Sequence, residues 1–103
     1  MSKFLHFAVN MGVTTISEVE DFEKILNDAG DKLVVVDFFA EWCGPCRMIG
    51  PKFEKMSDEF SDIIFLKVDV DEVEEVAENY DVSAMPNFVF IKNGRQVNIN
   101  SYK

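Results

Sequence analysis

Two cysteines, Cys43 and Cys46, are the residues whose type and spacing most clearly predict chemistry in this sequence. Disulfide exchange needs one thiolate that attacks a disulfide and a second thiol that resolves the resulting mixed disulfide. A separation of three residues puts the two thiols about one helical turn apart, close enough to form a disulfide with each other. Such a pair closes too short a loop to stabilise a fold, so it indicates a redox centre and not a structural cross-link.

The usual alternative for a Cys-x-x-Cys pair is half of a metal site. A structural zinc ion needs about four ligands. This sequence has no second cysteine pair, and its single histidine, His6, lies far away in the amino-terminal stretch. We therefore expect no metal site.

The position of the pair predicts a different role for each cysteine. Cys43 stands where a predicted strand ends and a helix begins, and the free N–H groups and positive dipole at a helix start favour a thiolate. Cys46 lies one turn further into the helix and should be more shielded and less acidic. We therefore expect Cys43 to attack and Cys46 to resolve.

Asp37 is the other informative residue, because it interrupts an apolar run a few residues before Cys43. A buried carboxyl group is costly unless it is protonated or paired, so its pKa should be raised, which suits proton transfer to and from Cys46. The alternative is simple strand alternation with Asp37 facing water, although apolar residues flank it on both sides. Lys67 could partner Asp37, but the sequence favours an ordinary surface lysine there.

Two further features of the sequence bear on the predicted redox site. Trp42 directly precedes Cys43 and either packs in the core or shields the thiolate and contacts substrate. The Met85–Pro86 dipeptide before a strand suggests a cis peptide bond, although trans X–Pro bonds are commoner.

Hydrophobic periodicity predicts the elements that position these residues. Ser17 and Glu20 form a capping-box pair that should start the first helix, and Gly30 should stop it. The apolar, β-branched run 33–39 is typical of a central strand buried on both faces. A second helix follows the cysteines, and Pro51 should kink it. One face of that helix carries Ile49, Phe53, Met56 and Phe60.

The remaining elements complete an alternating pattern. Strands are predicted at residues 13–16, 63–68 and 87–92. Apolar residues between Val73 and Tyr80 mark a third helix, and Asn93–Gly94 predicts a tight hairpin turn. Val97 and Ile99 alternate with polar residues, as in an edge strand with one buried face. The order β-α-β-α-β-α-β-β predicts an α/β fold with a mixed sheet.

Composition narrows the possible partners. The 103 residues suffice for one domain, and 10 basic against 19 acidic side chains give a net charge of −9. This balance argues against nucleic acid and against anionic membranes. No apolar stretch approaches the roughly 20 residues that a membrane span requires. The first ten residues lack the pattern of a signal peptide.

Taken together, several motifs closely resemble the thioredoxin family, of the animal-like type. The resemblance extends from about Val13 to Gly94 and is carried by 34–38, 40–46, Pro51, 65–71, Met85–Pro86 and 92–94. It implies the thioredoxin fold, a central mixed β-sheet flanked by helices, with residues 12–103 as the domain and residues 1–11 as an amino-terminal extension.

The same resemblance implies a function and a site. Asp37 would be a buried proton shuttle and Pro86 would face the cysteines in cis. Gly44 and Pro45 between the cysteines resemble the reducing members of the family. The resemblance further implies protein substrates with disulfides, a cytoplasmic location, no bound cofactor, and recharging by an NADPH-dependent thioredoxin reductase. The substrate platform would comprise Trp42, Gly44, Pro45, Met85 and Pro86.

The sequence also departs from the family pattern. Asn87 replaces the threonine that usually follows the cis proline, and Ser101–Tyr102 stand near the place of an expected glycine. The final helix of the family is missing after the last strand. We therefore expect a bare patch on one sheet face, exposing Phe88 or Phe90. A homodimer formed through this patch is the first candidate to cover it, and the amino-terminal segment with Phe4, Leu5, Phe7 and Val9 or a swapped element are the others.

The sequence as a whole predicts a thiol–disulfide oxidoreductase that reduces protein disulfides through Cys43 and Cys46. One alternative is a disulfide isomerase or oxidant. The other is a thioredoxin-like binding module with weak redox activity.

Overall fold

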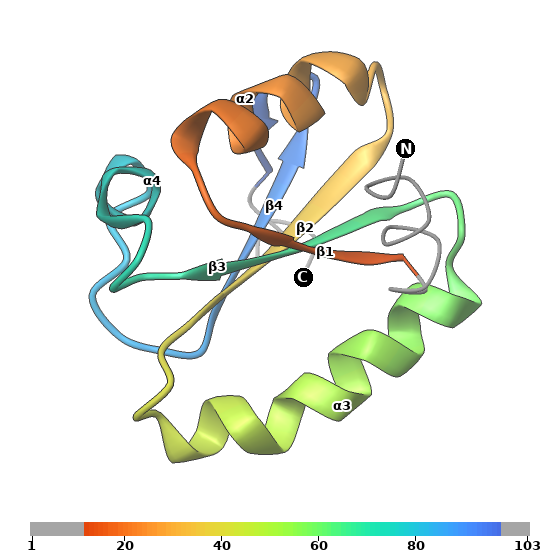
Figure 1. Ribbon diagram of the computed structural model, residues 1–103. Coiled ribbons are helices and arrows are strands. Elements are labelled where there is room, and N and C mark those ends of the chain that lie inside the picture. Colours follow the sequence, from red (N-terminus) through yellow and green to blue (C-terminus); the bar gives the residue numbers. More distant parts are fainter. Residues whose placement is uncertain (1–11, 98–103) are drawn as a thin grey trace, which may run out of the picture.

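The computed structural model describes residues 12–97 of the chain. In this range a five-stranded sheet lies between two layers of helices, with α2 and α4 on one face and α3 on the other (Figure 1). The elements in chain order are β1 (Val13–Ile16), α2 (Val19–Asp28), β2 (Leu33–Phe39), α3 (Gly44–Glu59), β3 (Ile64–Asp69), α4 (Glu74–Asn79), β4 (Asn87–Lys92) and β5 (Arg95–Gln96).

The sheet is mixed, as the sequence predicts. Its strand order is β1-β3-β2-β4-β5. Strands β1, β3 and β2 run parallel, whereas β4 pairs antiparallel with β2 and β5 pairs antiparallel with β4. Strand β2 is therefore central and buried, and its carboxyl end leads directly into the loop before α3.

The face under α2 and α4 is a closed apolar core. Val34, Val36 and Phe38 of β2 point to this side and are at most 1% exposed. They pack against Leu66 and Val68 of β3 and against the apolar sides of the two helices. Tyr80, which carries a phenolic hydroxyl, packs against the edge of this cluster.

The face under α3 holds a smaller cluster. Phe53 of α3 packs against Phe65, with ring centroids 5.2 Å apart, and against Phe88, at 5.7 Å. Phe88 and Phe90 both face this side and both are half-buried. Neither ring is fully exposed, because both pack against the cluster around Phe53, and whether this face is a bare patch stays a prediction.

Several element boundaries differ from the predictions. Glu18, and not Ser17, caps α2, and no side chain bonds to the helix start. The capping box is wrong because α2 begins at Val19, which places Ser17 one residue too early. Gly30 follows the helix with a φ of +62°, as expected for a helix stop.

Helix α3 continues through Pro51 to Glu59. Of its predicted apolar face, Phe53 is buried, but Met56 and Phe60 are 43% and 48% exposed. The core contact of the second half of the helix is therefore made mainly by Phe53, whereas Met56 and the C-cap residue Phe60 lie largely outside it.

The hairpin turn is confirmed, with Asn93 and Gly94 both at positive φ, as a tight turn between antiparallel strands requires. Strand β5 is only two residues long, and the Val97 N–H then donates to the Phe90 carbonyl at 2.6 Å. The predicted continuation at Ile99, the 1–11 extension and Ser101–Tyr102 lie outside the described residues.

Candidate active site

The site lies in the loop between the carboxyl end of β2 and the start of α3. Cys43 is the N-cap of α3, and Gly44 and Pro45 form the exposed first turn. Proline is well tolerated there, because N–H groups in the first turn have no partner within the helix. The sequence thus starts the helix at the first cysteine and places the second cysteine one turn into it.

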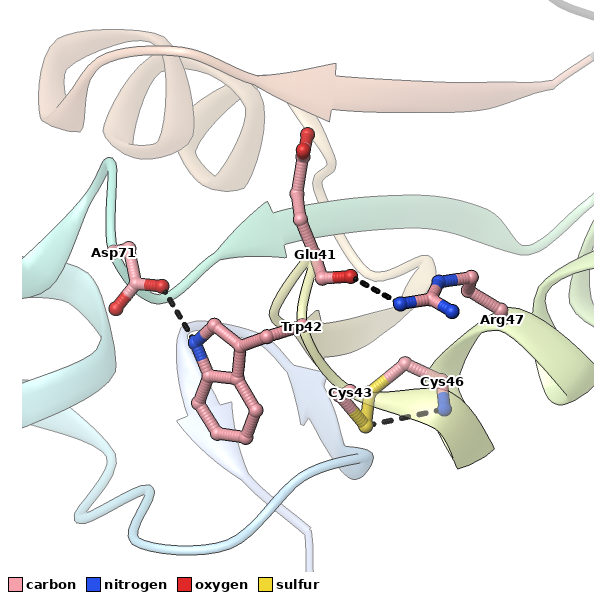
Figure 2. The surroundings of a disulfide bond; sticks show 6 residues. All are labelled: Glu41, Trp42, Cys43, Cys46, Arg47 and Asp71. Carbon is pink, nitrogen blue, oxygen red and sulfur yellow. Dashed lines mark hydrogen bonds between the residues drawn. A yellow bond between two sulfur atoms is a disulfide. The ribbon is translucent and has the colours of Figure 1, made fainter.

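Cys43 and Cys46 form a disulfide, with their Cα atoms 5.3 Å apart (Figure 2). The Cys43 Sγ also accepts a hydrogen bond from the backbone N–H of Cys46 at 3.1 Å. An N–H group aimed at this sulfur stabilises negative charge on it, which is what an attacking thiolate needs.

The two cysteines do not differ in burial, contrary to the sequence-based expectation. In the disulfide form Cys43 is 4% and Cys46 6% exposed. Both pack in one small cluster with Ala40, and Met85 and Val70 lie against it. The hydrogen bond to Cys43, and not its exposure, is therefore what distinguishes the two sulfurs in this state.

Asp37 is buried on the α3 face of β2, with 1% of its surface exposed. Its Oδ1 has no hydrogen-bond partner among residues 12–97. Burial raises the pKa of Asp37 from 3.8 to about 6, and the positive charge of Lys67 partly opposes this rise. The water-facing alternative is therefore wrong, and Asp37 is a carboxyl group that titrates near neutral pH.

Lys67 lies opposite Asp37 in the register of β2 and β3. It is half-buried, and its ammonium group sits 4.6 Å from the centre of the Phe39 ring. An ammonium over an aromatic face is attracted by the ring quadrupole. The expectation of an ordinary surface lysine is wrong, because the adjacent strands bring Lys67 beside the buried carboxyl group.

Trp42 is 67% exposed, so the core-packing alternative is wrong. Its indole N–H donates to the Asp71 Oδ2 at 3.0 Å (Figure 2). Asp71 is itself held by its backbone N–H, which donates to the Asp69 Oδ1 at 2.9 Å. Sequence reasoning missed this contact, since Asp71 lies 29 residues from Trp42 and only the parallel pairing of β2 and β3 brings them together.

The Met85–Pro86 peptide is cis, as predicted. Met85 packs against the cluster that contains both cysteines, so the loop before β4 lies beside the disulfide. Asn87 begins β4 and pairs with Phe38 of β2.

A cavity of about 380 Å³ lies on the flank of α3 behind Cys46. Gly50 lies at this cavity, and the Lys67 Nζ is the nearest atom to the position that a Cβ would take there, at 4.0 Å. The sequence carried no clear signal for this cavity. It is lined by Phe39, Ala40, Glu41, Cys46, Arg47, Gly50, Pro51, Glu54 and Lys67.

These features suit thiol–disulfide exchange. The start of a helix supports a thiolate at one sulfur, a second sulfur lies within bonding distance, and the strand that leads into the site carries a buried carboxyl group with a raised pKa. The family model "Thioredoxin" matches residues 13–103. The chain belongs to the thioredoxin family.

Relatives within the thioredoxin family are similar over most of their length. Thioredoxin of Gallus gallus is 51% identical over 85 residues, which is 82% of this chain and 81% of the relative. Thioredoxin of Geodia cydonium is 59% identical over 75 residues, 73% of this chain and 71% of the relative. The crystal structure of Fasciola hepatica thioredoxin superposes with a TM-score of 0.80 at 50% identity, covering 82% of both chains.

Membership of the thioredoxin family, together with the Cys43–Cys46 disulfide, establishes the reaction class. The chain is a thiol–disulfide oxidoreductase, and like other thioredoxins it is a protein-disulfide reductase that needs no bound cofactor. No helix in the described part of the chain is long and apolar enough to cross a membrane.

Proposed function

We propose that Cys43 is the nucleophile, Cys46 the resolving thiol and Asp37 the acid/base group in the reduction of protein disulfides. One observation carries the assignment: the Cys43 Sγ caps α3 and accepts the Cys46 N–H at 3.1 Å. The same donor and the helix dipole would stabilise a thiolate on Cys43 once the disulfide is opened.

The proposed reaction begins with the reduced dithiol. The Cys43 thiolate attacks one sulfur of the substrate disulfide, forms a mixed disulfide and expels the other substrate sulfur as a thiolate. The Cys46 thiol then loses its proton and attacks the Cys43 sulfur, which releases the second substrate sulfur. The substrate gains two electrons, and the enzyme ends as the Cys43–Cys46 disulfide seen in this structure.

Asp37 suits the second step. A carboxyl group with a pKa of about 6 is mostly ionised at pH 7 and can still bind a proton near that pH. It can therefore accept the Cys46 proton as the mixed disulfide is resolved and return it when the disulfide is next reduced.

The proposed substrate platform surrounds the disulfide. Trp42, Gly44 and Pro45 are exposed on the α3 side, and the cis Met85–Pro86 segment borders the cysteines on the other. An extended substrate strand could pair with the free backbone of Met85 while its disulfide faces Cys43.

The source of electrons and the cellular location follow from the same proposed function. The electrons would come from NADPH through thioredoxin reductase, which would be a partner alongside the disulfide-bearing substrates. A reducing, cytoplasmic location suits such a role, because thiols are kept reduced there. Residues 12–103 would form the catalytic domain and residues 1–11 an extension, in keeping with the family match at 13–103.

The alternatives receive no comparable support. If the chain were an isomerase, an oxidant or a binding module, the Gly44–Pro45 pair and the buried carboxyl group of Asp37 would need another explanation. A homodimer through the α3 face stays a prediction, and the half-buried Phe88 and Phe90 do not favour it.

A test compares insulin-disulfide reduction by wild type, Cys43→Ser and Cys46→Ser, with dithiothreitol as reductant. We expect Cys43→Ser to lose at least about 100-fold in rate, because no thiolate remains to attack. Cys46→Ser should instead accumulate a mixed disulfide with the substrate, visible by mass spectrometry. Trapping by Cys43→Ser and not by Cys46→Ser would reverse the two roles.

A further inference from the structure

Arg47 makes a contact that the reaction scheme above does not use. Its Nη2 donates to the backbone carbonyl of Glu41 at 3.0 Å (Figure 2). Arg47 lies in the first turns of α3, after both cysteines, whereas Glu41 precedes them. The bond therefore closes a short ring of chain that contains Trp42 and both cysteines.

The neighbouring residues of this loop have other anchors. The Phe39 carbonyl accepts the Val70 N–H at 2.9 Å, and the Ala40 carbonyl accepts the Cys43 N–H at 3.1 Å. The Trp42 indole is bound to Asp71. Among these anchors, only Arg47 is a side chain of the helix that carries both cysteines.

The anchors of Trp42 and Glu41 act from different sides. Figure 2 shows Asp71 on one side of the Glu41–Trp42 segment and Arg47 on the other, with the disulfide below them. Trp42 is largely exposed, so little packing holds its ring in place. The orientation of Trp42 depends on these two hydrogen bonds and on the peptide that joins it to Glu41.

Arginine is well suited to this position. Its guanidinium group presents N–H donors in a rigid planar fork. One N–H reaches the Glu41 carbonyl while the rest of the group lines the 380 Å³ cavity behind Cys46.

We propose that Arg47 is a positioning residue that holds the Glu41–Trp42 peptide against α3 and so presets the exposed Trp42 for docking protein substrates. This inference rests on the proposed function, and it assigns Arg47 to recognition and not to chemistry. Arg47 contacts no reacting sulfur through a hydrogen bond in the described structure.

The test compares Arg47→Met with a matched control, Lys52→Met, which removes the same charge from another exposed position of α3. Each variant is assayed with insulin over a range of concentrations and with a small aromatic disulfide that needs no docking surface. The ultraviolet absorbance of the thiolate gives the titration of Cys43, and fluorescence anisotropy reports the mobility of Trp42.

For Arg47→Met we expect KM for insulin to rise roughly fivefold, the size of effect that loss of one charge-assisted hydrogen bond produces. Its kcat, its rate with the small disulfide and the titration of Cys43 should match wild type, and the anisotropy of Trp42 should fall. Arg47→Lys, which keeps a donor, should recover at least half of the KM change, and Lys52→Met should change nothing.

The proposal is overturned by a wild-type KM in Arg47→Met, by no recovery in Arg47→Lys, or by an equal KM change in Lys52→Met. A shifted titration of Cys43, or an equal loss with the small disulfide, would also overturn it and assign Arg47 an electrostatic role in chemistry. Failure of wild type itself to reduce insulin would instead refute the proposed function.

Discussion

The two faces of the sheet are built for different purposes, although the same central strand supplies both. On the face under α2 and α4, Val34, Val36 and Phe38 of β2 are buried in the larger apolar cluster. On the face under α3, Val35 is followed by the buried Asp37 and then by Phe39, whose ring lies under the Lys67 ammonium.

This difference indicates where stability and chemistry are located. An apolar face gains free energy with every side chain that it buries. Ionisation of a buried carboxyl group costs free energy, because the charged form is removed from water. The α2/α4 face therefore stabilises a domain whose α3 face carries a costly but reactive group.

The largest expected effect tests the stabilising face. Leu66 of β3 is fully buried under the α2/α4 face, so Leu66→Ala should lower the free energy of unfolding by about 3–4 kcal/mol. Urea denaturation measures the loss, and insulin reduction below the transition should stay near wild type. A loss under 1 kcal/mol would mean that this face is not the main source of stability.

The next prediction concerns Asp37 on the α3 face, where a substitution should raise the free energy of unfolding by an amount similar to the loss in Leu66→Ala. Burial raises the pKa of Asp37 from 3.8 to about 6, so the fold favours the neutral carboxyl group. The contribution of this neutral group to the stability of the fold is complete below pH 4 and is lost as pH rises through 6. Asp37→Asn cannot ionise. It should be more stable than wild type by up to about 3 kcal/mol at pH 8 and show no gain below pH 4.

The same variant should also be slower in resolving the mixed disulfide, because the proton acceptor for Cys46 is gone. Urea denaturation at pH 4, 6 and 8 gives the stability curve, and insulin reduction gives the rate. An Asp37→Asn variant that is less stable than wild type at pH 8 would show that the carboxylate is paired in the fold and not merely buried.

The smallest effect concerns Lys67, whose positive charge lowers the pKa of Asp37. Lys67→Met removes this attraction, so Asp37 should titrate at a higher pH. The stability lost between pH 4 and pH 8 should then grow by on the order of 1 kcal/mol. Lys24→Met, in an exposed ion pair with Asp28 on α2, is the control and should leave the pH dependence unchanged. Identical titration of Asp37 in wild type and Lys67→Met would remove Lys67 from the site.

Local sequence signals predicted most of the scaffold. The strand at Leu33–Phe39, the strand at Asn87–Lys92 and the Asn93–Gly94 turn match the structure residue for residue, because runs of β-branched residues and turn residues act locally. The Ser17 capping box was wrong because a one-residue shift of the helix start removes its geometry.

Some residues of the candidate site were predicted from the sequence, whereas other contacts were found only in the structure. The disulfide partners, the buried Asp37 and the cis Pro86 were predictable, since spacing, hydrophobic context and resemblance to thioredoxins all point to them. The contacts of Trp42 with Asp71 and of Lys67 with Phe39 join residues far apart in the chain, and no local pattern encodes such pairs.

By itself, therefore, the sequence determined the reactive groups and the order of the elements. The spacing of Cys43 and Cys46 places them one turn apart at the start of a helix, and the apolar neighbours of Asp37 predict that its carboxyl group is buried. Only the tertiary structure decided how these groups are tuned. The parallel pairing of β2 and β3 places Lys67 beside Asp37, and the path of the loop brings the Glu41 carbonyl to Arg47. Electrostatic shifts and hydrogen bonds depend on distances between atoms, and the packing of the whole sheet sets those distances.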